Sequence, residues 1–417
     1  MPDNVSKKAD PWIGDIPQDW NRFRIKDIAE ISPGFSDFVP TSNEKCVVVP
    51  MEALSEKGEI HASLIQEFQD IQPGLTNFEE GDVLFAKITP CMENGKGAFI
   101  DHLPTRYGFG STEFHVLRPG QKLNGKFLYY FTFNPVYRQY AADNMTGAAG
   151  QKRVSTKFLA YTPIFLPLFI EQQRIAAYLD KACAAIDGAI QAKRRQLEVL
   201  DDLRKSIIHK AVTRGLDETV GFIESGSHTI GLMPRHWKQS KLRYEISVRN
   251  GDFASDKLED EGHYPVIGGN GLMGKTNEFN VDGEVVVVGR VGANCGNAHY
   301  ITGQVWVSDN AMIIESHHDK GFLTYLFRAL DLNSFAKKTA QPLITGTQIK
   351  NMYVALPSLS EQKQIVEFIE GKSGQIDILR RNLEGQITAL EKYRKSLIHE
   401  CVTGKRRITG ADLAKKG

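Results

Sequence analysis

The chain repeats itself along its length, and this duplication limits its architecture more than any other feature. The pattern Ile-Gly-x-x-Pro-x-x-Trp at 13–20 returns at 230–237, an offset of 217 positions. Residues 166–213 match residues 356–403 at an offset of 190, with 16 identities in 48 positions. Because the offset shrinks from 217 to 190, the leading part of the second copy is 27 residues shorter. The sequence therefore predicts a tandem duplication of one structural unit.

The leading part of each copy has the pattern of a small mixed domain. Short apolar runs such as 83–85 and 285–288 are separated by glycine-containing turns, which favours short strands. Some helix is expected around 126–140 and 322–338. We therefore expect strands joined by turns, with a few helices, in each leading domain.

The trailing part of each copy predicts one long helix. Residues 171–212 and 361–402 contain no proline, and their apolar residues step by three and four positions. Each segment follows a Leu-Pro pair, which disfavours helix upstream and favours a helix start just after it. About 42 residues at ~1.5 Å each would give an arm of roughly 60 Å. We expect the two arms to pack as an antiparallel coiled coil; the alternative is that each is a core helix of a bundle.

The predicted fold class is α+β, with two globular domains in tandem repeat, each followed by a long helix. The expected parts are domain 1 (1–165), arm 1 (166–215), domain 2 (216–355), arm 2 (356–404) and a C-terminal tail (405–417). Glycines inside the arms weaken a helix, so we expect the arms to bend or pack closely there. These glycines are Gly188, Gly371, Gly374 and Gly385.

Composition excludes several classes of protein. The longest apolar stretch, 158–170, is short and contains two prolines, so it cannot cross a bilayer, and we expect a cytoplasmic location. The five cysteines are scattered, which favours reduced thiols, and the histidines show no metal-ligand spacing. A net charge of +1 is low for a protein that grips DNA alone, although it permits local basic faces.

Two motifs suggest enzymatic activity but do not fit their context. Residues 269–276 match the phosphate-binding loop pattern, yet only six residues separate them from the turn before the 285–288 strand, which leaves no room for the required helix. Residues 134–137 (Asn-Pro-Val-Tyr) resemble the Asn-Pro-Pro-Tyr box of adenine methyltransferases, but no cofactor loop accompanies them. A turn in a helical segment is the better interpretation of 134–137. We expect no catalytic residue, no metal site and no cofactor bound by this chain.

Glycine-rich loops in the two domains are the best candidates for contact with DNA, because donors on such loops can approach bases and phosphates closely. The candidates are Lys87, Thr89, Asn94, Lys96, Arg106, Ser111, Lys152 and Arg153 in domain 1, and Asn270, Lys275, Arg290, Asn294, Asn297, Gln348 and Lys350 in domain 2. For any one of them, a solvated surface group is the alternative interpretation.

The repeat as a whole resembles the specificity subunit of type I restriction–modification systems. The resemblance is carried by the Leu-Pro-x-x-x-Glu-Gln-x-x-Ile junctions at 166–175 and 356–365 and by the two Ile-Gly-x-x-Pro-x-x-Trp openings. The stretches 81–84 and 290–296 also look like that family. The resemblance implies two target recognition domains, each reading one half of a bipartite asymmetric site in double-stranded DNA.

The resemblance also implies partners. The helices would set the spacing between half-sites and dock two modification (methyltransferase) subunits, with Glu171, Gln172, Glu361 and Gln362 as candidate docking residues. In the family, those subunits use S-adenosylmethionine, and two further restriction subunits use ATP and Mg²⁺. Two alternatives remain open: a fused enzyme, for which no unassigned stretch is large enough, and a non-catalytic coiled-coil scaffold with general DNA-binding end domains.

Overall fold

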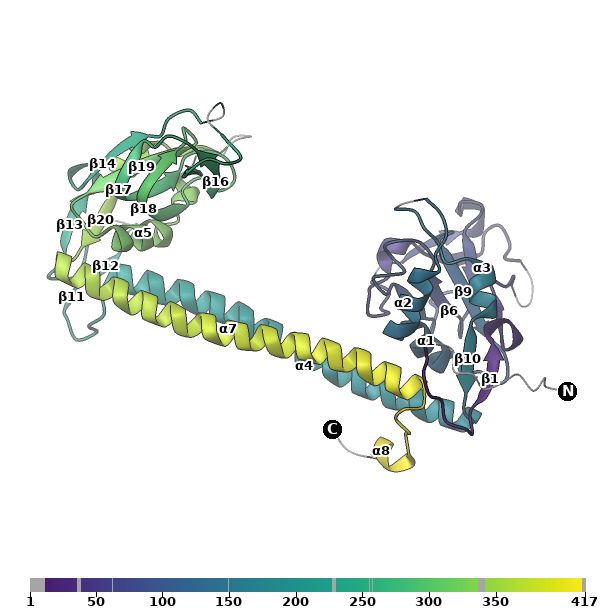
Figure 1. Ribbon diagram of the computed structural model, residues 1–417. Coiled ribbons are helices and arrows are strands. Elements are labelled where there is room, and N and C mark those ends of the chain that lie inside the picture. Colours follow the sequence, from purple (N-terminus) through teal and green to yellow (C-terminus); the bar gives the residue numbers. More distant parts are fainter. Residues whose placement is uncertain are drawn as a thin grey trace. The chain divides into compact units, whose positions relative to one another are not determined.

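The structure is a computed structural model, and it describes residues 12–35, 39–61, 63–148, 150–226, 230–254, 256, 258–336 and 342–414. The chain forms two compact units (Figure 1). Unit 1 comprises Met1–Ala192 and Gly385–Gly417, and unit 2 comprises Lys193–Glu384. Each unit therefore contains one globular domain, the beginning of its own long helix and the end of the long helix from the other copy.

Unit 1 is built on two four-stranded sheets, in the orders β2-β9-β6-β7 and β4-β3-β8-β5, and on the antiparallel pair β1-β10. All four residues of β6 are buried, so this strand is covered on both faces. The strands are β1 Asn21–Arg24, β2 Ala29–Ile31, β3 Lys45–Val49, β4 Leu64–Glu67, β5 Thr76–Phe78, β6 Val83–Ala86, β7 Gly97–Phe99, β8 Tyr107–Gly110, β9 Phe114–Pro119 and β10 Pro163–Leu166. The shorter helices are η1 Ile25–Asp27, η2 Met51–Ala53, η3 Phe68–Asp70, α1 Gly125–Phe133, α2 Pro135–Asp143, α3 Thr156–Tyr161 and α8 Gly410–Ala414.

Unit 2 carries one six-stranded sheet, in the order β14-β19-β17-β18-β15-β16, and the antiparallel pairs β11-β12 and β13-β20. Its strands are β11 Phe222–Glu224, β12 Leu232–Pro234, β13 Lys238–Lys241, β14 Ile246–Asn250, β15 Tyr264–Gly268, β16 Gly271–Thr276, β17 Val281–Gly289, β18 Ala298–Val307, β19 Ala311–Ser316 and β20 Tyr353–Leu356. Its shorter helices are η4 Leu242–Tyr244, α5 Lys320–Ala329, η5 Leu332–Phe335 and α6 Gly346–Lys350. The mixture of strands and helices agrees with the predicted α+β class.

The two long helices are α4 (Phe169–Arg214) and α7 (Leu359–Val402). Within unit 1, the first part of α4 and the last part of α7 share one apolar core, in which Ile175 and Leu179 join Leu397 and Cys401. Within unit 2, Val212 near the end of α4 shares a core with residues near the start of α7. In each unit, the beginning of one helix thus lies against the end of the other, as in an antiparallel pair.

Two sequence motifs have ordinary structural roles. The segment 269–276 contains β16, which forms an antiparallel hairpin with β15, so no helix follows its glycines. Asn134 ends α1 and caps α2: its Oδ1 accepts from the Val136 amide (3.0 Å), and Pro135 occupies the first turn of α2. The helical segment expected around 126–140 is therefore two helices, because proline lacks the amide that would continue the first one. In the described part of the chain, no helix is long and apolar enough to cross a membrane.

A loop of the same kind follows the central buried strand of each domain. Loop 1 (residues 87–96) joins β6 to β7, and loop 2 (residues 290–297) joins β17 to β18. Each loop contains most of the glycine-rich stretch that the sequence singled out as a DNA-contact candidate in its domain.

Candidate nucleic-acid interface

Loop 1 is held at its base by main-chain hydrogen bonds to two distant segments. The Thr89 amide donates to the Lys152 carbonyl (3.0 Å), and the Val154 amide donates to the Lys87 carbonyl (2.9 Å). The Lys87 amide donates to the Glu113 carbonyl (2.9 Å). The structure therefore brings together three groups of predicted DNA-binding residues, around positions 87, 111 and 152.

Loop 2 is held by the same pattern of bonds. The Gly292 amide donates to the Pro342 carbonyl (2.9 Å), and the Ile344 amide donates to the Arg290 carbonyl (3.0 Å). The Arg290 amide donates to the Asn310 carbonyl (2.9 Å). These three bonds match those of loop 1 one for one, so the duplication includes the backbone of the loop as well as the surrounding fold.

The matching bonds place Lys87 and Arg290 at equivalent positions. Each is a half-buried basic residue directly after the central strand, and the main chain of each is fixed by two hydrogen bonds. Lysine neutralises phosphate, whereas arginine can also form a bidentate pair with a guanine edge. One position thus carries related but different chemistry in the two domains.

Several predicted side chains are exposed, as a contact with DNA requires. They are Asn94, Arg106 and Lys152 in unit 1, and Asn270, Lys275, Asn294 and Asn297 in unit 2. The turn that bears Asn270 approaches the end of β17, just before loop 2, because a Cβ added to Gly289 would lie 2.4 Å from the Gly269 carbonyl oxygen. Glycine at 289 is therefore required by this close approach.

Other predicted side chains are already engaged within the chain. The Lys96 ammonium donates to the Met51 carbonyl (3.0 Å), and the Thr89 hydroxyl points to the Met145 sulfur (3.7 Å). Gln348 caps α6 through Thr345. These contacts use polar groups of Lys96 and Gln348 within the chain, and a contact of either residue with DNA stays a prediction.

Arg153 forms a bidentate pair with Glu113, with Nη2–Oε1 at 2.7 Å and Nε–Oε2 at 3.0 Å. The Arg153 guanidinium holds the pKa of Glu113 below its usual range, so the carboxylate stays charged at neutral pH. This pair joins the segment at 153 to the one at 113, and both support loop 1. The guanidinium of Arg153 thus stabilises the segments on which loop 1 rests.

Four candidates lie outside the residues of loops 1 and 2. Arg106 directly precedes β8, whereas Ser111 directly follows it, so a whole strand separates the two. Lys275 lies opposite Pro265 in the β15–β16 hairpin, and Lys350 ends α6. Of these residues, only Ser111 belongs to the group around loop 1, and its hydroxyl accepts from the Glu113 amide (3.2 Å).

The sequence matches the family model of the type I restriction modification DNA specificity domain over residues 17–198 and 234–389. The two matched segments correspond to the two copies of the repeat and cover more than half of the chain. The chain belongs to this family.

Two specificity subunits of type I restriction enzymes are similar to this chain in sequence, which supports the assignment to this family. The type I restriction enzyme EcoAI specificity subunit of Escherichia coli is 32% identical over 206 residues, which are 49% of this chain and 34% of the relative. The match thus spans about a third of that protein's length. The type I restriction enzyme MjaVIII specificity subunit of Methanocaldococcus jannaschii is 22% identical over 442 residues and covers 94% of both chains.

Among solved structures, a chain from a study of complex assembly and conformational transition in the type I R-M system has the same fold. Its TM-score is 0.75 at 18% identity, covering 94% of this chain and 100% of that chain. The specificity-domain fold is therefore present in both copies of the repeat.

The predicted docking residues divide into two kinds in this family member. Gln172 is buried: its Oε1 accepts from the Asn124 amide (2.9 Å), and its Nε2 donates to main-chain carbonyls. Gln362 is buried in the same way, with Oε1 accepting from the Asp319 amide (2.9 Å). Both glutamines join a long helix to the N-cap residue of a domain helix, Asn124 before α1 and Asp319 before α5. Their polar groups are used within the chain, and docking of a partner on Gln172 and Gln362 stays a prediction.

The two glutamates remain partly accessible. Glu171 pairs with Arg407 (Oε1–Nε 3.1 Å), and Glu361 accepts from the Trp237 indole (3.0 Å) and from His236 (3.1 Å). Each glutamate thus ties the start of a long helix to its own unit. Docking of a partner on Glu171 and Glu361 stays a prediction.

One cluster in unit 2 has the residue types of a metal site. Ligand atoms of Glu245, His317 and His318 lie within 4.8 Å of one another. However, His318 is bonded on both sides: its Nε2 lies 3.0 Å from the Glu245 carboxylate, and its Nδ1 lies 2.9 Å from the Gln362 side-chain amide. The Lys238 ammonium also lies 3.0 Å from the Glu245 carboxylate. Although burial raises the pKa of Glu245, hydrogen bonds with Ser240, His318 and Lys238 outweigh it and lower the pKa to about 2. In the described part of the chain these groups form a hydrogen-bonded network, in which Lys238 pairs with Glu245 and His318 joins Glu245 to Gln362 on α7.

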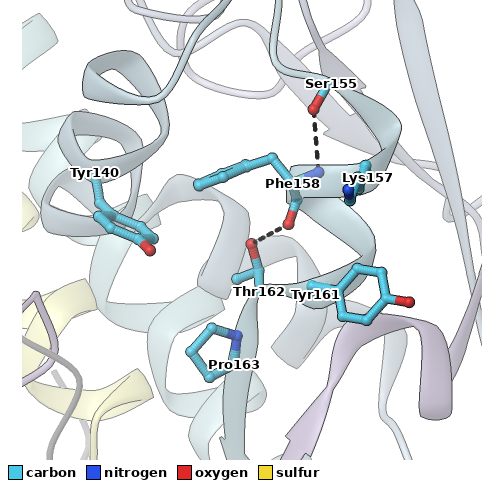
Figure 2. Close-up of a pocket in the computed structure, with 7 residues that line it drawn as sticks. All are labelled: Tyr140, Ser155, Lys157, Phe158, Tyr161, Thr162 and Pro163. Atoms are coloured by element: carbon cyan, nitrogen blue, oxygen red, sulfur yellow. Dashed lines mark hydrogen bonds between the residues drawn. The ribbon is translucent and has the colours of Figure 1, made fainter.

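Unit 1 contains a cavity of about 340 Å³ beside α3 and β10 (Figure 2). Figure 2 shows that two of its polar side chains bond to the main chain: Ser155 accepts from the Phe158 amide (3.1 Å), and the Thr162 hydroxyl donates to the Phe158 carbonyl (3.0 Å). Tyr140 and Phe158 supply aromatic walls, with ring centroids 5.3 Å apart.

Proposed function

We propose that the chain reads a two-part DNA sequence, with one domain for each half-site. The observation that supports this most directly is the repeated loop: loops 1 and 2 have the same main-chain bonds but different side chains. The equivalent residues Lys87 and Arg290 begin the loops, and exposed asparagines follow in both. Asparagine and arginine are the side chains that pair best with the edges of adenine and guanine. Two domains with different loop residues are suited to an asymmetric site.

The partners follow from the family. The chain would act as the non-catalytic recognition subunit and would bring two methyltransferase subunits to the DNA, where they use S-adenosylmethionine. Two restriction subunits with ATP and Mg²⁺ would complete a nuclease. Partners that carry their own basic surface also account for a net charge of only +1 in this chain. The exposed faces of α4 and α7 are the proposed docking surface.

The test is co-expression of the chain with its cognate modification subunit in a host without other methylation, followed by single-molecule sequencing of the methylated DNA. We expect adenine methylation at one bipartite sequence only when both proteins are present. Methylation by the modification subunit alone with the same sequence preference would refute the proposal. Complex formation without any sequence preference would favour the alternative, a scaffold with general DNA-binding ends.

A further inference from the structure

A buried arginine on α2 binds the main chain of loop 1 from the interior of the domain. Arg138 on α2 is 6% exposed, and its guanidinium lies between the rings of Phe85 (5.1 Å to the centroid) and Phe133 (4.8 Å). Its Nη1 donates to the carbonyl of Met92, in the middle of loop 1, at 2.6 Å. The same carbonyl accepts from the Gly95 amide (3.1 Å), so Arg138 contacts the turn that shapes the loop.

Unit 2 has a side chain with the same task at the equivalent position. Asn333 in η5 lies 13 residues after the first residue of α5, as Arg138 lies 13 residues after the first residue of α1. The Asn333 Nδ2 donates to the carbonyls of Ala293 (3.0 Å) and Cys295 (2.9 Å), both in loop 2. The contact between the second helix and the loop is therefore kept in the two copies, although the residue type has changed.

The cost of burying Arg138 indicates that its contact has a purpose beyond packing. Burial lowers the pKa of Arg138 to about 10, and its Nε and Nη2 have no hydrogen-bond partner in the described part of the chain. An apolar side chain of similar volume fills such a space without the desolvation penalty of a charge. It could not, however, donate to the Met92 carbonyl. The buried guanidinium is thus explained by the loop that it holds.

We propose that Arg138 and Asn333 are positioning residues that fix the recognition loops before DNA binds, and so determine how sharply each half-site is read. This inference rests on the proposed function. Asn94 lies two residues after Met92, and Asn294 lies between the two residues whose carbonyls bind Asn333. Both exposed asparagines are therefore carried by a backbone that is held from the interior. A fixed backbone avoids the entropy of ordering the loop on binding and penalises a wrong base more strongly.

The first measurement is hydrogen exchange in the full-length chain, which needs no DNA. In Arg138→Met, which lacks the donor, the amides of loop 1 should exchange faster and those of loop 2 should not change. In Asn333→Asp, which has the same shape without the donor, the reverse is expected. Arg138→Lys keeps a donor and should restore most of the protection. Unchanged exchange in loop 1 of Arg138→Met would overturn the inference at this step.

The second measurement is methylation sequencing with the cognate modification subunit. Arg138→Met should reduce discrimination at one half-site by roughly tenfold, and Asn333→Asp should do so at the other. Ile164→Val, a core change in unit 1 away from loop 1, is the control for simple destabilisation; equal relaxation of specificity in this variant would refute a positioning role. If the wild-type pair methylates no bipartite sequence, the proposed function fails, while the exchange data still decide whether the two side chains hold the loops.

Discussion

Arg394 on α7 lies against Asp187 on α4, with Nε and Oδ2 3.3 Å apart, and the duplication repeats this ion pair as Arg204 with Asp377. Each partner of the second pair is 190 positions from its counterpart in the first, the offset of the long helices in the sequence. In both pairs the two residue numbers add to 581, as they do for Asp201 and Arg380. One antiparallel register therefore holds in both units.

The two copies of this ion pair should differ in strength. Arg394 and Asp187 have side chains 15% and 23% exposed, whereas Arg204 and Asp377 are 30% and 53% exposed. Solvent screens the second pair more, so a double-mutant cycle with alanine should give a coupling energy of about 1–2 kcal/mol for the first pair and below about 1 kcal/mol for the second. Urea unfolding monitored by hydrogen exchange would report each unit separately. Equal coupling in both pairs would contradict this ranking.

The glycines of the long helices predict an easy gain in stability. A Cβ at Gly188, Gly371, Gly374 or Gly385 would meet nothing within 4 Å, so the expected close packing at these glycines is not found. Alanine at Gly188 or Gly371 should raise the free energy of unfolding by about 0.5–1 kcal/mol, because it favours helix without a clash. Gly289→Ala is the matched contrast: its Cβ would lie 2.4 Å from a carbonyl oxygen, and thermal unfolding should show a loss.

Acid should weaken unit 2 through Glu245. Its folded-state pKa is lowered to about 2 from an ordinary 4.5, so the folded state binds the proton less readily than the unfolded state. The stabilisation is complete above pH 4.5 and is lost as the pH falls from 4.5 toward 2. The unfolding free energy of Glu245→Gln should therefore be lower at pH 7 and flatter across this window than that of the wild type. Parallel pH profiles for the two proteins would show that Glu245 does not cause the dependence.

Much of this architecture follows from the sequence, because the signals are local. The proline-free apolar stripes predicted both long helices, and the glycine spacing indicated loops 1 and 2. What the sequence missed depends on partners far along the chain. At a helix start, Gln172 and Gln362 were predicted to be docking residues on the surface. In the fold they are buried, because they accept hydrogen bonds from the main-chain amides of Asn124 and Asp319.

The loop residues show the same limit. Lys96 and Arg153 have the charge of DNA-binding residues, and only the fold reveals that Met51 and Glu113 engage them. Arg138 and Asn333 gave no signal at all, because they are different residue types whose acceptors are main-chain carbonyls. Their equivalence is visible only in the fold, where each contacts the loop of its own unit.

The equivalence of Lys87 and Arg290 predicts separable effects on the two half-sites. Arg290→Ala should weaken specific binding by about 1–3 kcal/mol if its guanidinium reads a base, and should relax the sequence at one half-site only. Lys87→Ala should act on the other half-site, with a uniform loss of affinity if lysine contacts phosphate. Binding to DNA variants at two salt concentrations distinguishes the cases. Arg290→Ala with unchanged affinity and preference would place Arg290 among the ordinary surface groups.

The register of the long helices makes the proposed ruler testable. Seven residues inserted in α4 after Ala192, and seven in α7 before Gly385, would keep both Arg394–Asp187 and Arg204–Asp377 in register. One heptad adds about 10 Å of helix, which corresponds to roughly 3 base pairs at 3.4 Å each. The double insertion should therefore lengthen the spacer between the methylated half-sites by about that amount.

The matched control is a heptad inserted in α4 alone. It lengthens one helix between the two ion pairs but not the other, so the pairs cannot both form on straight helices. We expect this variant to lose methylation or unfold at lower temperature, whereas the double insertion stays folded. Methylation sequencing reads the spacer directly. An unchanged spacer in a folded, active double insertion would mean that something other than the length of α4 and α7 sets the distance between the half-sites.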